Sequence, residues 1–158
     1  MRNSLVNYIF FAMIGFIILI IIISNTQAKN QNEVFLDDFK TYSTALNLLS
    51  EEDYERSKNM LTQLYDKYPD NYTISYSLAK AYVMLDDYQE AARLYEEAIE
   101  KFPFFQLDPD YCSEYGKTLL QLNEKEKGKA YLLKARELFT EFGQEKEANE
   151  ITKVLNSI

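Results

Sequence analysis

The sequence of 158 residues contains no histidine, no tryptophan and only one cysteine, Cys112. Without histidine the chain cannot form a serine–histidine–aspartate triad or the usual zinc sites, and a single cysteine cannot form an internal disulfide. Glycine and proline are also scarce, with four and three residues. This scarcity favours helices joined by short turns over a fold rich in loops and strands. We therefore expect no enzyme, no catalytic residues, no metal site and no cofactor.

Acidic residues outnumber basic ones, and the formal net charge is −8. Residues 1–28 contain Arg2 and no carboxylate, so residues 29–158 hold 16 basic and 25 acidic groups, a net charge of −9. Nucleic acids and anionic membrane surfaces repel a body of this charge, so we expect no nucleic acid partner. Most acidic residues are interspersed with lysines, which is typical of solvated helix faces rather than of paired catalytic carboxylates.

An apolar run opens the chain. Between residues 5 and 23 the only strongly polar side chain is Asn7. A helix of that length reaches roughly 28 Å, close to the ~30 Å hydrocarbon core of a bilayer. The run predicts an N-terminal transmembrane anchor over residues 1–24, which spans the membrane with residues 5–23, and a polar linker over residues 25–33. The alternatives are a cleaved signal peptide, for which the run is longer than usual, and a buried core helix.

The charges that flank the apolar run predict its orientation. Arg2 and the terminal amine precede the run, whereas only Lys29 follows it closely. The positive-inside rule then predicts a cytoplasmic N-terminus and a body outside the cytoplasm. We interpret the isoleucine-rich composition of residues 5–23 as typical of a bacterial protein. We expect a single-pass protein of the bacterial plasma (inner) membrane.

One sequence segment of 18 residues occurs twice, in related form, in the rest of the chain. The segment DDYQEAARLYEEAIEKFP at 86–103 repeats EDYERSKNMLTQLYDKYP at 52–69, with the acidic pair, Tyr, Lys and Pro at the same offsets. Each phrase belongs to a unit with two apolar-periodic segments of helical length. Proline closes each unit because it cannot continue the preceding helix. Small residues, among them Ala79 and Ala98, stand where paired helices must touch.

The turns contain helix-start signals. Asp87 followed by Glu90 has the spacing of a capping box. Asp108 followed by Pro109 is the favoured order for an N-cap and first helical position. Asn123 is the next candidate N-cap. These signals predict helices that begin near residues 88, 109 and 124.

The pattern resembles the tetratricopeptide repeat, a helix–turn–helix unit of 34 residues. The matching residues are Leu78, Ala79, Tyr82, Ala91, Tyr95, Ala98 and Pro103 in one unit and Ala45, Leu48, Tyr54, Ser57, Leu61 and Pro69 in the unit before it. A third, looser unit follows an insertion of three residues and matches at Gly116, Leu119, Leu122, Gly128, Leu132 and Ala135.

This resemblance implies an all-α helix–turn–helix solenoid. The implied repeats span about 38–71, 72–105 and 109–142, and a capping helix at 144–157 completes a domain of residues 34–158. A terminal capping helix is expected because stacked repeats leave their last apolar face exposed. The resemblance also places Cys112 where the family packs a large apolar side chain, so we expect an inert, half-buried thiol.

In tetratricopeptide arrays the first helices of successive units line a concave groove that generally holds segments of other proteins. Carried over to this chain, the groove residues are Phe39, Tyr42, Leu46, Leu49, Tyr76, Lys80, Val83, Met84, Lys117, Leu120 and Gln121. Lys80 and Lys117 occupy the same place in adjacent units, which predicts a small cationic column. Tyr42 and Leu46 stand where the chaperone-docking branch of the family has Lys and Asn, so we do not expect binding of chaperone tails.

The apolar run and the resemblance together therefore imply a membrane-anchored interaction or scaffold module that binds a peptide or helix of a partner protein. The alternative is a structural subunit of a membrane complex or homo-oligomer, with the groove permanently filled. The chain's own linker or a second copy could also cover the apolar stripe of the groove. Coverage by the linker or by a second copy is thus the main competitor to partner binding.

Overall fold

The computed structural model describes residues 16, 17, 20 and 33–158. Most of the predicted anchor and nearly all of the predicted linker lie outside the described residues. Within the part of the chain that is described, no helix is long and apolar enough to cross a membrane. Residues 1–41 and residues 42–158 form two compact units. The second unit contains the candidate site.

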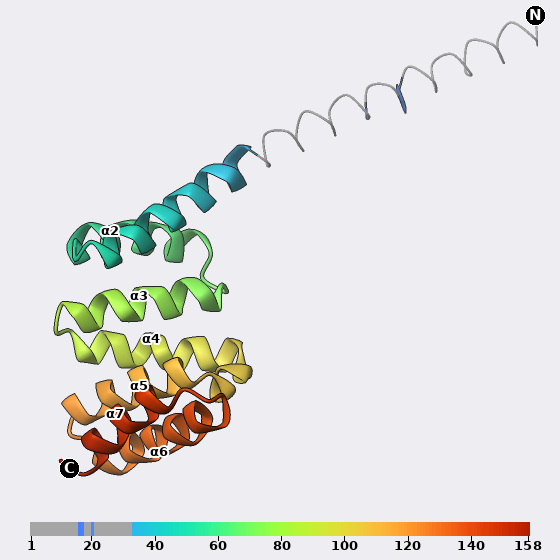
Figure 1. The fold of residues 1–158 in the computed structure, drawn as a ribbon. Helices are drawn as coiled ribbons and strands as arrows, with labels where there is room; N and C mark the ends of the chain where they lie inside the picture. Colours follow the sequence, from blue (N-terminus) through green and yellow to red (C-terminus); the bar gives the residue numbers. More distant parts are fainter. Residues whose placement is uncertain (1–15, 18–19, 21–32) are drawn as a thin grey trace, which may run out of the picture. The chain divides into compact units, whose positions relative to one another are not determined.

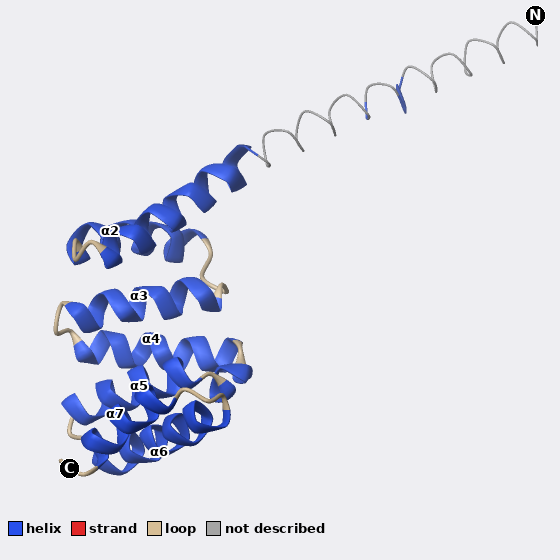
Figure 2. Ribbon diagram, viewed as in Figure 1, coloured by secondary structure: helices blue, strands red, loops and turns tan. Residues whose placement is uncertain are grey.

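Every regular element among the described residues is helical (Figures 1 and 2). Residues 33–50 are helical and precede α2 (Tyr54–Lys67), α3 (Tyr72–Met84), α4 (Tyr88–Lys101), the 3-10 helix η1 (Pro103–Leu107), α5 (Pro109–Gln121), α6 (Lys125–Glu141) and α7 (Glu145–Leu155). Consecutive helices from α2 to α7 pack against one another. This arrangement confirms the prediction of an all-α fold for these residues.

The turns within each helix pair share one backbone geometry. Glu52, Asp86, Asn123 and Gly143 have φ angles of 62°, 60°, 61° and 73°. In each turn the N–H of the following residue donates to the carbonyl five residues earlier, at 2.8–3.0 Å. This is the Schellman arrangement that closes a helix C-terminus. The prediction of Asn123 as an N-cap is wrong, because this residue takes the left-handed position, which asparagine tolerates.

Aspartates cap three of the helices. The carboxylates of Asp53, Asp87 and Asp108 accept backbone N–H bonds from residues three positions further on, at 3.4, 3.2 and 2.9 Å. Asp108 therefore caps α5 as predicted. The capping box is only half formed, because Glu90 pairs with Arg93 at 2.6 Å instead of reaching back to Asp87.

The small residues of the third unit bring two backbones into contact. A Cβ atom on Gly116 would lie 3.0 Å from the carbonyl oxygen of Gly128, and one on Gly128 would lie 2.9 Å from that of Gly116. Helices α5 and α6 thus cross with no room for a side chain. Ala79 and Ala98 are likewise completely buried.

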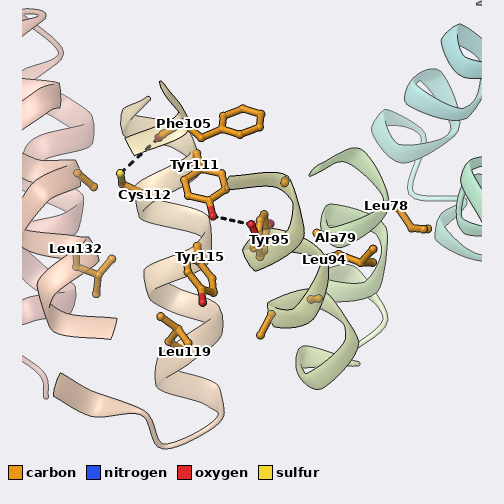
Figure 3. Packing of buried hydrophobic residues seen from close by; sticks show 14 of the residues in the cluster. Leu78, Ala79, Leu94, Tyr95, Phe105, Tyr111, Cys112, Tyr115, Leu119 and Leu132 are labelled. Carbon is orange, nitrogen blue, oxygen red and sulfur yellow. Dashed lines mark hydrogen bonds between the residues drawn. The ribbon is translucent and has the colours of Figure 1, made fainter. Parts of the chain in front are cut away.

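The second unit ends in η1, which leads into the insertion of three residues, 106–108, and Phe105 of η1 enters the core (Figure 3). The Phe105 ring stacks on Tyr111, with centroids 4.9 Å apart and an interplanar angle of 12°. It meets Tyr72 of α3 edge-on at 5.6 Å. Helix η1 thus places an aromatic side chain in the space where α3, α4 and α5 meet.

Replacing Gly128 by Ala should destabilise the protein. In a solvent-exposed helix this change would stabilise by up to about 1 kcal/mol, because alanine has the higher helix propensity. Here the added methyl meets the backbone of α5, so we expect a net loss of about 1–3 kcal/mol in the free energy of unfolding, measured by denaturant titration. The exposed neighbour Lys129→Ala is the matched control and should change it by less than about 0.5 kcal/mol. A gain in stability for Gly128→Ala would show that α5 and α6 do not touch.

Candidate binding groove

A single hollow in residues 42–158 contains most of the predicted groove residues. It has a volume of about 650 Å³, which is typical of ligand-binding pockets. It lies over the helical residues 42–50, α3 and α5, with one contribution from α4. The residues that line it are Tyr42, Leu46, Leu49, Ser50, Thr73, Tyr76, Ser77, Lys80, Val83, Met84, Tyr95, Glu114 and Lys117.

Eight of the eleven predicted residues line this groove, namely Tyr42, Leu46, Leu49, Tyr76, Lys80, Val83, Met84 and Lys117. Three do not. Phe39 belongs to the unit formed by residues 1–41. Leu120 packs against the core, and Gln121, the last residue of α5, is exposed away from the lining.

Sequence reasoning missed five lining residues, namely Ser50, Thr73, Ser77, Tyr95 and Glu114. Thr73 and Ser77 lie one helical turn apart on α3, in line with Lys80 and Met84. That spacing was a usable signal, because residues three and four apart share a helix face. Glu114 stands one turn before Lys117 and carried the same signal.

One end of the groove is apolar and open to solvent. Leu46 and Met84 expose 36% and 50% of their surface, whereas Leu49 and Val83 are half-buried against the core. The Tyr42 hydroxyl lies 2.9 Å from the Ser77 hydroxyl and so joins the first helix to α3. An apolar side chain of a ligand would find matching surface here.

The other end is organised around one carboxylate. Glu114 of α5 accepts hydrogen bonds from the hydroxyls of Tyr76 and Tyr95, at 2.9 and 3.4 Å. Its second oxygen forms an ion pair with Lys80 at 3.0 Å. These partners come from α3 and α4. Glu114 therefore connects three helices at the floor of the groove.

This ion pair changes the predicted cationic column. Lys80 is paired with Glu114 and lies 5.3 Å from the centroid of the Tyr76 ring. Lys117 is exposed and, among the described residues, forms no ion pair. The groove thus carries one uncompensated positive charge rather than two.

Tyr76 is a fixed part of the groove wall. Its ring lies 5.9 Å from Tyr95, 5.1 Å from Phe105 and 6.0 Å from Tyr111, measured between centroids. Burial, together with the charge of Glu114, raises the pKa of the Tyr76 hydroxyl far above its usual value. Removing this ring would damage the core as well as the groove.

Two observations bear on metal binding and thiol reactivity in the described part of the chain. No group of three or more Cys, Asp, Glu or His side chains among these residues could hold a metal ion. Cys112 is completely buried rather than half-buried, and burial raises the pKa of its thiol to about 11. The thiolate, which is the nucleophilic form, is thus suppressed at neutral pH.

Comparison with known proteins identifies the fold. Residues 42–104 match the family model described as tetratricopeptide repeat. The Yersinia enterocolitica type III secretion translocator chaperone SycD superposes with a TM-score of 0.65 at 19% identity, covering 75% of this chain and 80% of SycD. PcrH, solved in complex with the chaperone-binding region of PopD, gives a TM-score of 0.63 at 15% identity, with coverages of 75% and 87%.

A yeast protein shows the same likeness. The TPR2B domain of Sti1, solved as a complex with pHsp70, gives a TM-score of 0.62 at 18% identity and covers 75% of this chain and 93% of that domain. No curated protein matches the sequence. The structural matches confirm the predicted tetratricopeptide-like solenoid.

The buried tyrosines predict a loss of stability at alkaline pH. Burial raises the pKa of Tyr95, Tyr111 and Tyr115 well above the value of 10.0 expected in the unfolded chain. Below pH 10 both states keep these protons, and the contribution to stability is complete. Above pH 10 the unfolded chain releases protons that the folded chain retains, so stability falls.

With thirteen tyrosines and no tryptophan, tyrosinate absorbance reports this titration directly. We expect Tyr95, Tyr111 and Tyr115 to ionise only as helical circular dichroism is lost. In denaturant all of them should ionise together near pH 10. Complete ionisation with the helices intact would contradict the described burial.

Proposed function

We propose that this chain is a non-enzymatic interaction module whose groove holds a segment of a partner protein. The observation that carries the proposal is the open apolar end of the groove, where Leu46 and Met84 are exposed beside a hydrogen-bonded floor. Two structurally similar proteins, PcrH and the Sti1 domain, were solved with parts of other proteins. Their likeness in fold supports the same kind of ligand here.

The groove suits a peptide or helix better than a small molecule. Its lining combines leucine, valine and methionine with tyrosine and serine hydroxyls along one open surface. Apolar and aromatic contacts of this kind supply most of the affinity at protein interfaces, whereas charges at the rim mainly adjust rate and specificity. Because its floor is already packed and hydrogen-bonded, little further ordering is needed on binding.

A second function, self-association, is favoured by a different observation. In the unit of residues 1–41, Val34, Phe35, Leu36 and Phe39 expose 48%, 66%, 56% and 59% of their surface. Clustered exposed apolar residues often mark association sites. The alternative is therefore a structural subunit whose apolar residues are covered by a second copy.

We also propose that residues 5–23 anchor the protein in a bacterial plasma membrane, with the body outside the cytoplasm. The sequence supports this proposal through the length of the apolar run and the position of Arg2. An anchored body would scaffold its partners at the membrane surface.

Site-specific photo-crosslinking from position 84 of the full chain in bacterial membranes tests both the binding of a partner in the groove and the membrane anchor. We expect a crosslinked partner with the otherwise unchanged chain and its loss with Leu46→Asp. A carboxylate buried against apolar groups without a partner should weaken binding at least about tenfold. The matched control is Asn47→Asp, because Asn47 is exposed beside Leu46 but does not line the groove.

Three outcomes would count against the proposal. Equal loss with Leu46→Asp and Asn47→Asp would show that the groove is not the binding surface. A crosslinked product that contains only a second copy of the chain would favour the structural subunit. Recovery of the chain in the soluble fraction, rather than in membranes, would contradict the proposal that residues 5–23 anchor it.

A further inference from the structure

Three charged groups line the groove of a body whose net charge is −9. They are Lys80, Glu114 and Lys117, and their sum is one positive charge. A local positive charge within an acidic protein selects ligands by sign more sharply than it adds affinity. The arrangement of these groups therefore bears on the ligand of the proposed function.

Glu114 cannot readily turn to neutralise Lys117. The two residues are three apart on α5, a spacing at which Glu and Lys often pair. However, Glu114 already accepts from the Tyr76 and Tyr95 hydroxyls and pairs with Lys80. Tyr95 is completely buried, so a Glu114 that turned away would leave its hydroxyl without this acceptor. A buried unsatisfied hydroxyl is costly, and the Lys80 pair is therefore retained.

Lys117 is left as the charged group that a ligand would cover. A purely apolar segment bound along the groove would remove water from the ammonium group of Lys117 without replacing the lost hydrogen bonds. A carboxylate on the ligand would compensate that loss with a charge-assisted hydrogen bond. The groove thus favours a ligand with an acidic side chain at this end.

We infer that the groove selects a protein segment with one acidic side chain beside its apolar ones. The acid lies against Lys117, and the apolar side chains lie against Leu46, Val83 and Met84. This inference rests on the proposed function, since it specifies the ligand of the same groove.

The segment carries a single acid at this place rather than an acidic run. Lys80 is already neutralised, so a second ligand carboxylate near it would meet the negative charge of Glu114. Like charges brought together in a partly desolvated interface disfavour the wrong partner. Lys117 and Glu114 thus act as a pair of specificity residues, one attractive and one repulsive.

Selection from a library of random displayed peptides tests the inference on the full chain in detergent. The protein should enrich peptides that have one Asp or Glu at a fixed distance from apolar residues. With Lys117→Gln the apolar preference should persist and the acid preference should disappear. With Glu114→Gln, which keeps an oxygen acceptor for the tyrosines, peptides with a second acid should also be enriched.

One selected peptide, synthesised with a fluorescent label, gives the magnitude. Its affinity for Lys117→Gln should fall about fivefold relative to the unchanged chain, and this difference should shrink as salt is added. The matched control Lys129→Gln removes the same charge from an exposed position of α6 outside the groove. It should leave the affinity unchanged.

The outcomes separate this inference from the function on which it rests. Selected peptides that are apolar but show no acid preference, or an acid preference that survives Lys117→Gln, would overturn the inference and leave the binding groove standing. If the unchanged chain enriches no peptide more strongly than the Leu46→Asp variant does, the proposed function is contradicted, and so is this inference.

Discussion

The packing of Phe105 among the tyrosine rings is the contact on which the candidate site depends. Phe105 stacks on Tyr111 of α5 and touches Tyr72 and Tyr76 of α3, so one side chain sets the distance between two first helices. Tyr111 in turn donates a hydrogen bond of 2.8 Å to the Tyr95 carbonyl of α4 (Figure 3). With α5 held there, Glu114 reaches the tyrosine hydroxyls across the groove floor. The binding surface is thus a consequence of the aromatic core.

Two neighbouring glutamates hold α4 to the units on either side of it. Glu97 accepts from Tyr65 of α2 at 2.6 Å and from Ser75 of α3 at 3.1 Å. Glu96 accepts from Tyr115 of α5 at 2.8 Å and pairs with Lys127 of α6. Hydrogen bonding from Lys127 is the largest of the contacts that hold the pKa of Glu96 below its usual value. Polar contacts therefore reinforce the apolar stacking of the repeats and keep the groove floor in place.

Periodicity predicted the helices, because apolar residues recur at helical spacing along the chain. The groove residues came instead from the resemblance to the tetratricopeptide repeat, and most of them line the hollow. Neither predicted the contacts that decide the groove's charge. Lys80 and Glu114 are 34 residues apart and meet only after α3 and α5 have packed, so no local spacing marks their pair. Phe105 was not predicted as a core residue either, because it follows Pro103, the proline that closes the second repeat, where no helical periodicity marks a buried position. Asn123 was misassigned because cap and left-handed turn favour the same residue type.

The account makes the groove a preformed surface on one cooperative unit, open at its apolar end and charged at the other. Native-state hydrogen exchange tests this cooperativity most directly, because it measures the opening free energy of each helix separately. We expect the central amides of α3, α4 and α5 to exchange with the free energy of global unfolding, since the aromatic cluster joins these three helices. Central amides of α3 that open at a clearly lower free energy than those of α5 would contradict the account.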